Sequence, residues 1–289
     1  MLVTVDTKLI GLLGEPLKQT FSPQMHNETF AKLNLDYFYF PIEVNNENLA
    51  TVVNGIRKMH FAGFNVTKPN KIKIIEYLDE LDELAGKIGS VNTVVMKDGK
   101  LKGYNTDGEG FVQSLIDESG LDLKQCAFFV FGAGGAARAV ASTLAFKGAL
   151  KIYITDVYAA ASQSLVEDIN TKIAPCAEVV AFDDAVIPAV VNQCNVLINA
   201  SGVGMYPHLG ETPLAKTHLR KELFVADLTY NPAKTQLLLD AESNGCKIMN
   251  GIGMVINQGA KAFSLWTGVP EPVALMRETI NRIVAGDAE

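Results

Sequence analysis

Short apolar segments alternate with longer segments of helical periodicity along the first third of the chain. Strands that alternate with helices are typical of a largely parallel sheet with crossover connections. The pattern predicts strands at residues 9–13, 37–42 and 61–66 and helices at 23–33 and 48–59. Two further apolar segments, 90–96 and 101–104, flank an Asp98-Gly99 turn signal and predict a hairpin. A small α/β domain is therefore expected over residues 1–107.

The alternation restarts at Gly108 and predicts a second domain over residues 108–250. Its strands are expected at residues 127–131, 151–155, 178–182, 194–199, 223–227 and 246–249. Six strands separated by helices suit a doubly wound sheet. Residues 251–289 contain two more helical patterns, at 254–266 and 273–284, which are expected to return to the first domain. The predicted fold class is therefore α/β with two domains.

A glycine-rich loop follows the strand predicted at 127–131. It reads Gly132-Ala-Gly-Gly-Ala-Ala-Arg138 and leads into an apolar helix. Backbone N–H groups of such a loop, together with the helix N-terminus, receive a pyrophosphate, and the pattern tolerates alanine at its third glycine, here Ala137. The next predicted strand leads to Asp156, 24 residues after Gly132, where an acid that binds a ribose belongs. The sequence therefore predicts a Rossmann-type domain that binds NAD.

Two polar segments of the first domain each place an ionisable side chain beside turn formers. Asn65-Val-Thr-Lys-Pro-Asn-Lys71 predicts Lys71 in the first helical turn after a proline, where the helix dipole disfavours a cation. Gly103-Tyr-Asn-Thr-Asp-Gly108 carries Asp107. If Lys71 and Asp107 fold together, they form a proton donor and acceptor suited to redox chemistry at an alcohol carbon. The alternative from these residues alone is a solvated lysine and a helix-capping aspartate.

Composition narrows the classes of partner. The formal net charge of −7 argues against nucleic-acid and anionic-membrane partners, because both need a basic face. The four cysteines show no C-x-x-C spacing and the four histidines share no ligand spacing, so no metal site is expected. The first ten residues lack the pattern of a signal peptide, and no uncharged apolar run reaches the length of a membrane span. We expect a cytoplasmic protein, either a monomer or a homodimer.

Seven motifs, in chain order, resemble those of the shikimate dehydrogenase family, including its quinate/shikimate dehydrogenase branch. The motifs are Gly11-x-x-Gly-x-Pro16 with Ser22-Pro-x-x-His-Asn27, Asn65-Val-Thr-x-Pro-x-Lys71, Ile88-Gly-Ser-Val-Asn-Thr93, Tyr104-Asn-Thr-Asp-Gly108, Gly132-Ala-Gly-Gly135, Asn199-Ala-Ser-x-x-Gly-Met205, and Asn250-Gly-x-x-Met254 with Gln258-Gly259. The likeness spans nearly the whole chain. It implies a reversible, NAD(P)-dependent oxidation of the ring 3-hydroxyl of shikimate to 3-dehydroshikimate, with Lys71 and Asp107 as the catalytic pair.

The resemblance also implies which residues hold the two ligands. Ring hydroxyls of the substrate are assigned to Asn65, Thr67, Asn92 and Gln258, and its carboxylate to Thr20, Ser22 and Tyr230. The cofactor is assigned to Gly132, Ala133, Gly134, Gly135, Ala136, Asp156, Ser201, Met205, Gly251 and Met254. The structural alternatives are that Asn65 and Asn92 are turn residues, that Ser22 caps a helix and that Tyr230 lies at the edge of a core.

Three positions depart from the family pattern. Thr20 stands where the family usually has serine, which adds a methyl group at the carboxylate end of the pocket. The segment Thr155-Asp-Val-Tyr-Ala-Ala160 lacks the Asn-Arg-Thr clamp of NADP-using members, so NAD is expected to be preferred and NADP disfavoured. Gly202 replaces a proline. The alternative functions are a dehydrogenase of quinate or a related cyclohexane acid, and a dinucleotide-binding metabolite sensor without turnover.

Overall fold

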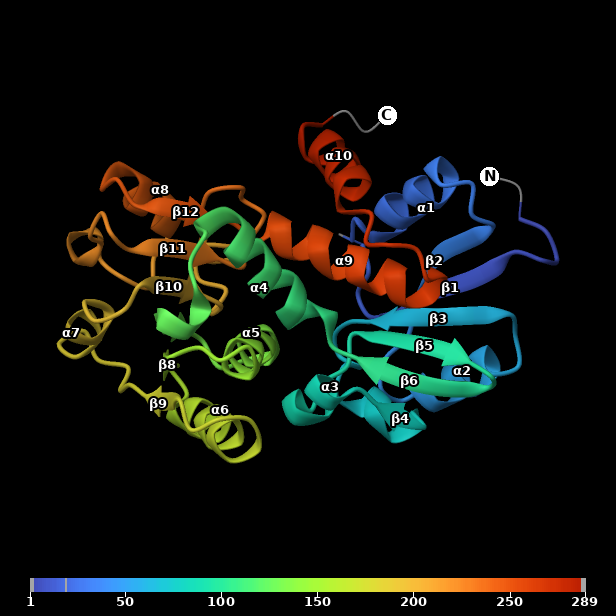
Figure 1. Cartoon of the computed structure of the whole chain (residues 1–289), viewed down its shortest axis with the longest axis horizontal. Coiled ribbons are helices and arrows are strands. Elements are labelled where there is room, and N and C mark those ends of the chain that lie inside the picture. The colour runs from blue at the N-terminus through green and yellow to red at the C-terminus, as the bar shows by residue number, and fades with distance from the viewer. Residues whose placement is uncertain (1–2, 19, 287–289) are drawn as a thin grey trace. The chain divides into compact units, whose positions relative to one another are not determined.

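The computed structural model describes residues 3–18 and 20–286 and divides the chain into two compact units (Figure 1). The first unit contains the residues up to Thr106 together with those from Ile256 onward, and the second contains Asp107–Val255. The predicted outer bounds of the domains, residues 1 and 289, lie outside the described residues.

The first unit is built on a six-stranded sheet with the order β2-β1-β3-β5-β6-β4. Its strands are β1 (Lys8–Gly14), β2 (Tyr37–Glu43), β3 (Phe61–Val66), β4 (Glu80–Leu81), β5 (Thr93–Lys97) and β6 (Lys100–Tyr104). β1 pairs in parallel with β2 and β3, as the alternating pattern predicts. β5 runs antiparallel to both β3 and β6, so the sheet is mixed rather than largely parallel. The predicted hairpin is present, and Asp98 and Gly99 both have positive φ, as its two-residue turn requires.

Helices cover both faces of this sheet. They are α1 (Ser22–Lys32), α2 (Leu49–Ile56), η1 (Lys73–Tyr77), α3 (Glu83–Ile88), the part of α9 (Ile252–Thr267) from Ile256, and α10 (Val273–Val284). Alternate residues of β2 point to opposite faces. Phe40 packs with the core beneath α2, whereas Tyr39 stacks on His26 of α1 and lies close to Trp266 of α9.

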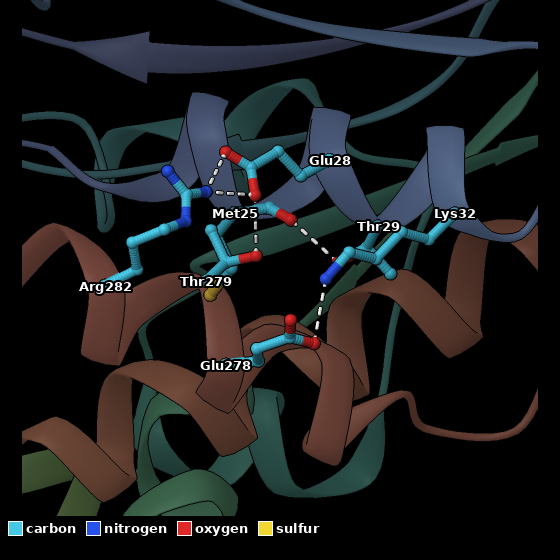
Figure 2. A network of polar contacts seen from close by, with 7 residues as sticks. All are labelled: Met25, Glu28, Thr29, Lys32, Glu278, Thr279 and Arg282. Atoms are coloured by element: carbon cyan, nitrogen blue, oxygen red, sulfur yellow. Dashed lines mark hydrogen bonds and ion pairs between the residues drawn. The ribbon is translucent and has the colours of Figure 1, made fainter. Parts of the chain in front are cut away.

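The C-terminal helix α10 is held against α1 by a polar network (Figure 2). The carboxylate of Glu28 accepts hydrogen bonds from Arg282 and from the Thr279 hydroxyl, the latter at 2.9 Å. One turn along α1, Lys32 forms an ion pair with Glu278 at 2.8 Å. The prediction that the C-terminal helices return to the first domain is therefore confirmed for α10.

The second unit contains an entirely parallel sheet with the order β12-β11-β10-β7-β8-β9. Its strands are β7 (Ala127–Phe131), β8 (Lys151–Thr155), β9 (Ala177–Val179), β10 (Val196–Asn199), β11 (Phe224–Asp227) and β12 (Lys247–Met249). Its helices are α4 (Thr106–Ser119), η2 (Leu123–Gln125), α5 (Gly135–Phe146), α6 (Ala159–Lys172), α7 (Ile187–Val191), η3 (Lys216–His218) and α8 (Gln236–Ser243).

The strand order of the second unit reverses between β7 and β10. This reversal is the topological switch point of a doubly wound fold, where ligands bind at the carboxyl ends of the strands. Apolar residues of the strands fill two buried cores, which contain Val130 and Phe129 respectively. The prediction of a doubly wound sheet is therefore confirmed. Within the described residues, no helix is both long and apolar enough to span a membrane.

Candidate active site

Lys71 lies in a turn, not in the first turn of a helix. Residues 68–72 form turns between β3 and the 3-10 helix η1. Asn70 stabilises this turn, because its side-chain Nδ2 donates to the backbone oxygen of Val44 at 2.8 Å. The helix expected after Pro69 is therefore present as η1 but begins at Lys73, and Lys71 lies in the turn just before it, where the Ile74 N–H donates to the Asn70 oxygen at 2.9 Å.

One short segment, Val91–Asn92, anchors the chain at both catalytic candidates. The N–H of Val91 donates to the backbone oxygen of Lys71 at 2.9 Å. The side-chain Oδ1 of Asn92 accepts the N–H of Thr106 at 2.7 Å. Asp107 is the next residue, in the first turn of α4, where the positive end of the helix dipole stabilises a carboxylate.

Asn65 lies inside strand β3, so the alternative that it is a turn residue is wrong. Its Nδ2 donates to the backbone oxygen of Asn92 at 3.1 Å and to Oγ1 of Thr93 at 2.9 Å. Its Oδ1 accepts the Tyr39 hydroxyl at 2.9 Å. A backbone oxygen can only accept, which fixes the orientation of the amide. Asn65 therefore has one acceptor lone pair left, and that lone pair suits a substrate hydroxyl that donates.

The Asn92 side chain joins Thr106, the first residue of α4, to Gln258 on α9. Its Nδ2 donates to Oγ1 of Thr106 at 2.9 Å and lies 3.5 Å from Oε1 of Gln258 on α9. Thr106 and Thr93 are fully buried, and their hydroxyl oxygens are 3.2 Å apart. This buried network holds the two candidates Asn92 and Gln258 close to each other.

The remaining substrate candidates of the first unit lie at the ends of elements. Ser22 is the first residue of α1, and Phe21 occupies the N-cap without a capping side chain, so the alternative that Ser22 caps the helix is wrong. Oγ1 of Thr20 instead accepts the Ser22 N–H at 3.2 Å, which keeps the two hydroxyl groups together. Thr67 follows β3, and its N–H donates to the Leu13 oxygen at 2.8 Å.

Tyr39 and His26 support this site, although the family motifs assign neither of them a role. Burial raises the pKa of Tyr39, and a hydrogen bond with Ser22 lowers it to a smaller extent. His26 stacks on Tyr39 with ring centroids 4.6 Å apart. Burial lowers the pKa of His26 to about 3, and among the described residues neither ring nitrogen has a hydrogen-bond partner. His26 is thus a neutral packing residue.

The glycine-rich loop of the second unit has the geometry for a pyrophosphate. Gly132 has a φ of +101°, and a Cβ there would approach the Ala200 oxygen to 2.7 Å. Ala133 follows in the loop. Gly134 is the N-cap of α5 without a side-chain cap, and a Cβ on Gly134 or Gly135 would meet nothing within 4 Å. The helix N-terminus, which begins Gly135-Ala136, is open for an anion, so these residues fit a bound dinucleotide.

Asp156 follows β8 and holds the glycine loop directly. Its Oδ2 accepts the Ala133 N–H at 2.7 Å and its Oδ1 accepts the Tyr158 N–H at 2.8 Å. Each carboxylate oxygen keeps a lone pair for a ribose hydroxyl. Arg138, a basic residue of α5, forms an ion pair with Asp168 of α6. Lys151 lies at the opposite end of β8, roughly 16 Å along the strand at 3.3 Å per residue, and pairs with Glu178.

The other cofactor candidates lie in loops and in α9. Ser201 donates its hydroxyl to Oδ1 of Asn199 at 2.6 Å. Met205 is 43% exposed. A Cβ on Gly251 would overlap the Leu228 carbonyl group, so only glycine fits there. Met254 packs on the core of the second unit.

Tyr230 is the one substrate candidate that lies in the second unit. Burial raises the pKa of its phenol. It is half-buried in the loop between β11 and α8. The structure therefore brings Asn65, Asn92 and Gln258 together in one network, and it places Tyr230 in a different part of the chain.

A buried acid that the motif analysis did not assign, Asp227, ends strand β11. Its carboxylate accepts hydrogen bonds from the Asn199 amide, the Thr235 hydroxyl and the Thr229 N–H. Burial raises the pKa of Asp227, and these hydrogen bonds lower it to a smaller extent. The sequence signal that could have found it is an acid at the carboxyl end of the strand predicted at 223–227. In the part of the chain that the structure describes, no group of three metal-ligating side chains occurs.

Comparison with known proteins decides the family. A family model described as the shikimate dehydrogenase substrate binding domain matches residues 12–94, and one described as the shikimate 5'-dehydrogenase C-terminal domain matches 251–280. A shikimate dehydrogenase (NADP(+)) of Alkaliphilus oremlandii (strain OhILAs) is 45% identical over 280 residues, covering 96% of this chain and 98% of the relative. The chain belongs to the shikimate dehydrogenase family. The resemblance drawn from the sequence motifs is confirmed.

Solved structures of shikimate dehydrogenases share the fold. A shikimate 5-dehydrogenase from Listeria monocytogenes, solved in complex with shikimate and NAD, is 42% identical with a TM-score of 0.92, covering 96% of this chain and 98% of that one. A quinate dehydrogenase from Corynebacterium glutamicum, in complex with NAD, is 31% identical with a TM-score of 0.88, covering 95% and 99%. The prediction of an enzyme is confirmed, since the chain is an NAD(P)-dependent alcohol oxidoreductase of this family.

Proposed function

We propose that this member of the shikimate dehydrogenase family reversibly oxidises the ring 3-hydroxyl of shikimate to 3-dehydroshikimate, with shikimate preferred over quinate. The main supporting observation is the hydrogen-bonded network of Asn65, Asn92 and Gln258, because oriented amide groups distinguish a polyol by its hydrogen bonds. The relative from Listeria monocytogenes, solved with shikimate, supports the same substrate.

In the proposed reaction the secondary alcohol loses a hydride from carbon and a proton from oxygen. When bound, the nicotinamide supplies the acceptor for the hydride. Lys71 and Asp107 take the hydroxyl proton between them, and the ammonium form of Lys71 stabilises negative charge on the oxygen as the carbonyl forms. Anchoring of both chain segments on Val91–Asn92 limits the motion of these two groups. Thr20 offers its hydroxyl to the substrate carboxylate, and Ser22, whose hydroxyl bonds Tyr39, can donate to that carboxylate by turning away from Tyr39.

We further propose that NAD is preferred over NADP, although the relative from Alkaliphilus oremlandii is named for NADP(+). Support comes from Asp156, whose two oxygens suit the adenosine ribose hydroxyls and would repel a 2′-phosphate. Residues 157–160 contain no basic side chain. Arg138 forms an ion pair with Asp168, which holds its guanidinium against α6.

Activity on quinate is proposed as a weaker side activity. Quinate carries a tertiary hydroxyl beside its carboxylate, so its carboxylate end is bulkier than that of shikimate. Thr20 adds a methyl group at that end and is stiff at χ1. The similarity to a quinate dehydrogenase supports a substrate range that includes quinate. The rival of a metabolite sensor is not favoured, because Lys71 and Asp107 are both retained. We propose action in the cytoplasm on small molecules, as a monomer or a homodimer.

The test is a kinetic matrix of the purified protein with shikimate and quinate, each with NAD and NADP, followed by absorbance of the reduced nicotinamide. NAD should exceed NADP by at least about tenfold in kcat/KM, equivalent to roughly 1.4 kcal/mol. Asp156→Ser should reduce that ratio, whereas Asp183→Asn, on an exposed loop, should leave it unchanged. Equal use of NADP by the parent would refute the cofactor proposal, and no turnover of either acid would refute the substrate proposal.

A further inference from the structure

Asp227 lies at the centre of a buried hydrogen-bond network in the second unit. Its side chain is fully buried at the carboxyl end of β11. Oδ2 accepts both the Asn199 Nδ2–H and the Thr235 hydroxyl, each at 2.8 Å, and Oδ1 accepts the Thr229 N–H at 2.9 Å. The carboxylate therefore joins the end of β10 to the loop between β11 and α8.

On one side, the network fixes the loop that follows β10. The Asn199 amide also donates to the Val203 oxygen at 2.9 Å. Because that backbone oxygen can only accept, Oδ1 of Asn199 must face the other way, where it accepts the Ser201 hydroxyl at 2.6 Å and the Ser201 N–H at 3.2 Å. Met205 lies two residues beyond Val203. The loop with two cofactor candidates thus depends on the Asn199 side chain.

On the other side, Asp227 closes the loop that carries Tyr230. Thr229 and Thr235 flank this loop, and both donate to the same carboxylate. Gly251, another cofactor candidate, donates its N–H to the Thr229 oxygen at 3.0 Å. The segment around Tyr230 is therefore fixed at both ends by one side chain.

We propose that Asp227 is a positioning residue that sets the cofactor-binding loop at Ser201–Met205 and the substrate-binding Tyr230 in one fixed arrangement. The inference rests on the proposed function, since that function gives these residues their ligands. Asp227 itself is fully buried and acts through Asn199 and Thr235. Disturbing it should weaken the binding of both ligands at once.

An asparagine cannot replace this carboxylate. In one orientation its NH2 group would face the Thr229 N–H, and in the other it would face both the Asn199 amide and the Thr235 hydroxyl. Either orientation leaves a buried donor without an acceptor. Asp227→Asn should therefore raise the KM values for shikimate and NAD together.

Thr235 provides a milder test, in case Asp227→Asn does not fold. Thr235→Val keeps the shape but removes the hydroxyl that donates to Asp227 and, as the N-cap of α8, accepts the Leu238 N–H. Thr235→Ser keeps both hydrogen bonds. The matched control is Thr212→Val, which removes the hydroxyl that donates to Leu214 in another loop of the same unit. The measurements are both KM values, the Kd of NADH without substrate, and the melting temperature.

Thr235→Val should raise both KM values and the Kd of NADH by about fivefold or more, the effect of losing the hydrogen bond to Asp227, and loss of the N-cap bond should also lower the melting temperature. Thr235→Ser and Thr212→Val should stay within about twofold of the parent. A lower melting temperature with unchanged KM values, or a change confined to one ligand, would overturn the inference while leaving the proposed function intact. A parent inactive on shikimate and quinate would refute the proposed function, and the inference with it.

Discussion

Gly108 allows α4 to approach α5 closely, and replacing it with alanine should disturb Asp107 beside it. A Cβ on Gly108 would overlap the Thr143 hydroxyl and the Ala139 carbonyl group, both on α5. The threonine side chain can rotate, but a helix carbonyl group cannot. The added methyl therefore has to push the first turn of α4 away from α5.

The expected magnitude follows from two opposing terms. Overpacking of this kind costs about 1–3 kcal/mol, and overlap with backbone places Gly108→Ala near the upper value. Replacing a helical glycine with alanine recovers roughly 0.5–1 kcal/mol. The net loss is about 2 kcal/mol, which should lower the melting temperature by about 4–8 °C for a unit of this size. Because a misplacement of about 1 Å at a reacting group can cost about 100-fold, kcat should fall by up to that factor.

Thermal unfolding and steady-state kinetics of two variants test this reasoning. Gly55→Ala is the control, since Gly55 lies in α2 and a Cβ there would meet nothing within 4 Å. It should stabilise the protein by about 0.4–1 kcal/mol and leave kcat unchanged. A Gly108→Ala variant that melts at or above the parent temperature with the parent kcat would refute the close-packing argument.

Three further outcomes are expected. Lys71→Met should lower kcat by at least about 100-fold with a comparatively small change in KM, whereas Lys68→Met should resemble the parent. Similar kinetics of the two variants would show that Lys71 is not the catalytic lysine. Thr20→Ser should reduce the preference for shikimate over quinate by a modest factor, because a methyl-sized change in a pocket is worth about 1–3 kcal/mol. An unchanged ratio of the kcat/KM values for shikimate and quinate would contradict this. Hydrogen bonding to Arg282 is the largest cause that lowers the pKa of Glu28. The contribution of Glu28 to folding stability is therefore present above its unfolded-state pKa and is lost as pH falls through its lower folded-state pKa. Glu28→Gln should destabilise the protein by up to about 1 kcal/mol at pH 7 and by less at pH 3. Denaturant titrations of the parent and the variant at the two pH values measure this difference.

Regular elements could be predicted because their sequence signal is local. Alternation and helical periodicity indicate the strands at 127–131 and 151–155 and the helix at 273–284, and the structure has the same bounds. The turn at Lys71 could not be predicted this way. It depends on the hydrogen bond from Asn70 to Val44, which lies 26 residues earlier in the chain. A local pattern contains no information about that partner.

The motifs predict some of the site residues but not their hydrogen-bond partners. They name Asn65 and Asn92 as candidates, but the orientation of the Asn65 amide depends on the backbone oxygen of Asn92, which lies 27 residues later in the chain. Asp227 was missed for a related reason, since an acid at a strand end looks like a solvated residue until its three donors are known. Tertiary hydrogen bonds, rather than residue type, distinguish such a carboxylate from a surface one.

The backbone of Gly202 limits how far family consensus can guide the engineering of this enzyme. Introducing the residue most common among relatives is an ordinary route to greater stability. Gly202 has a φ of +85°, however, and the ring of proline holds φ near −65°. Restoring a proline here would force the loop between Asn199 and Val203 into another conformation and break the hydrogen bond that joins them. A proline at this position requires a different loop geometry, so introducing it requires replacing the whole loop.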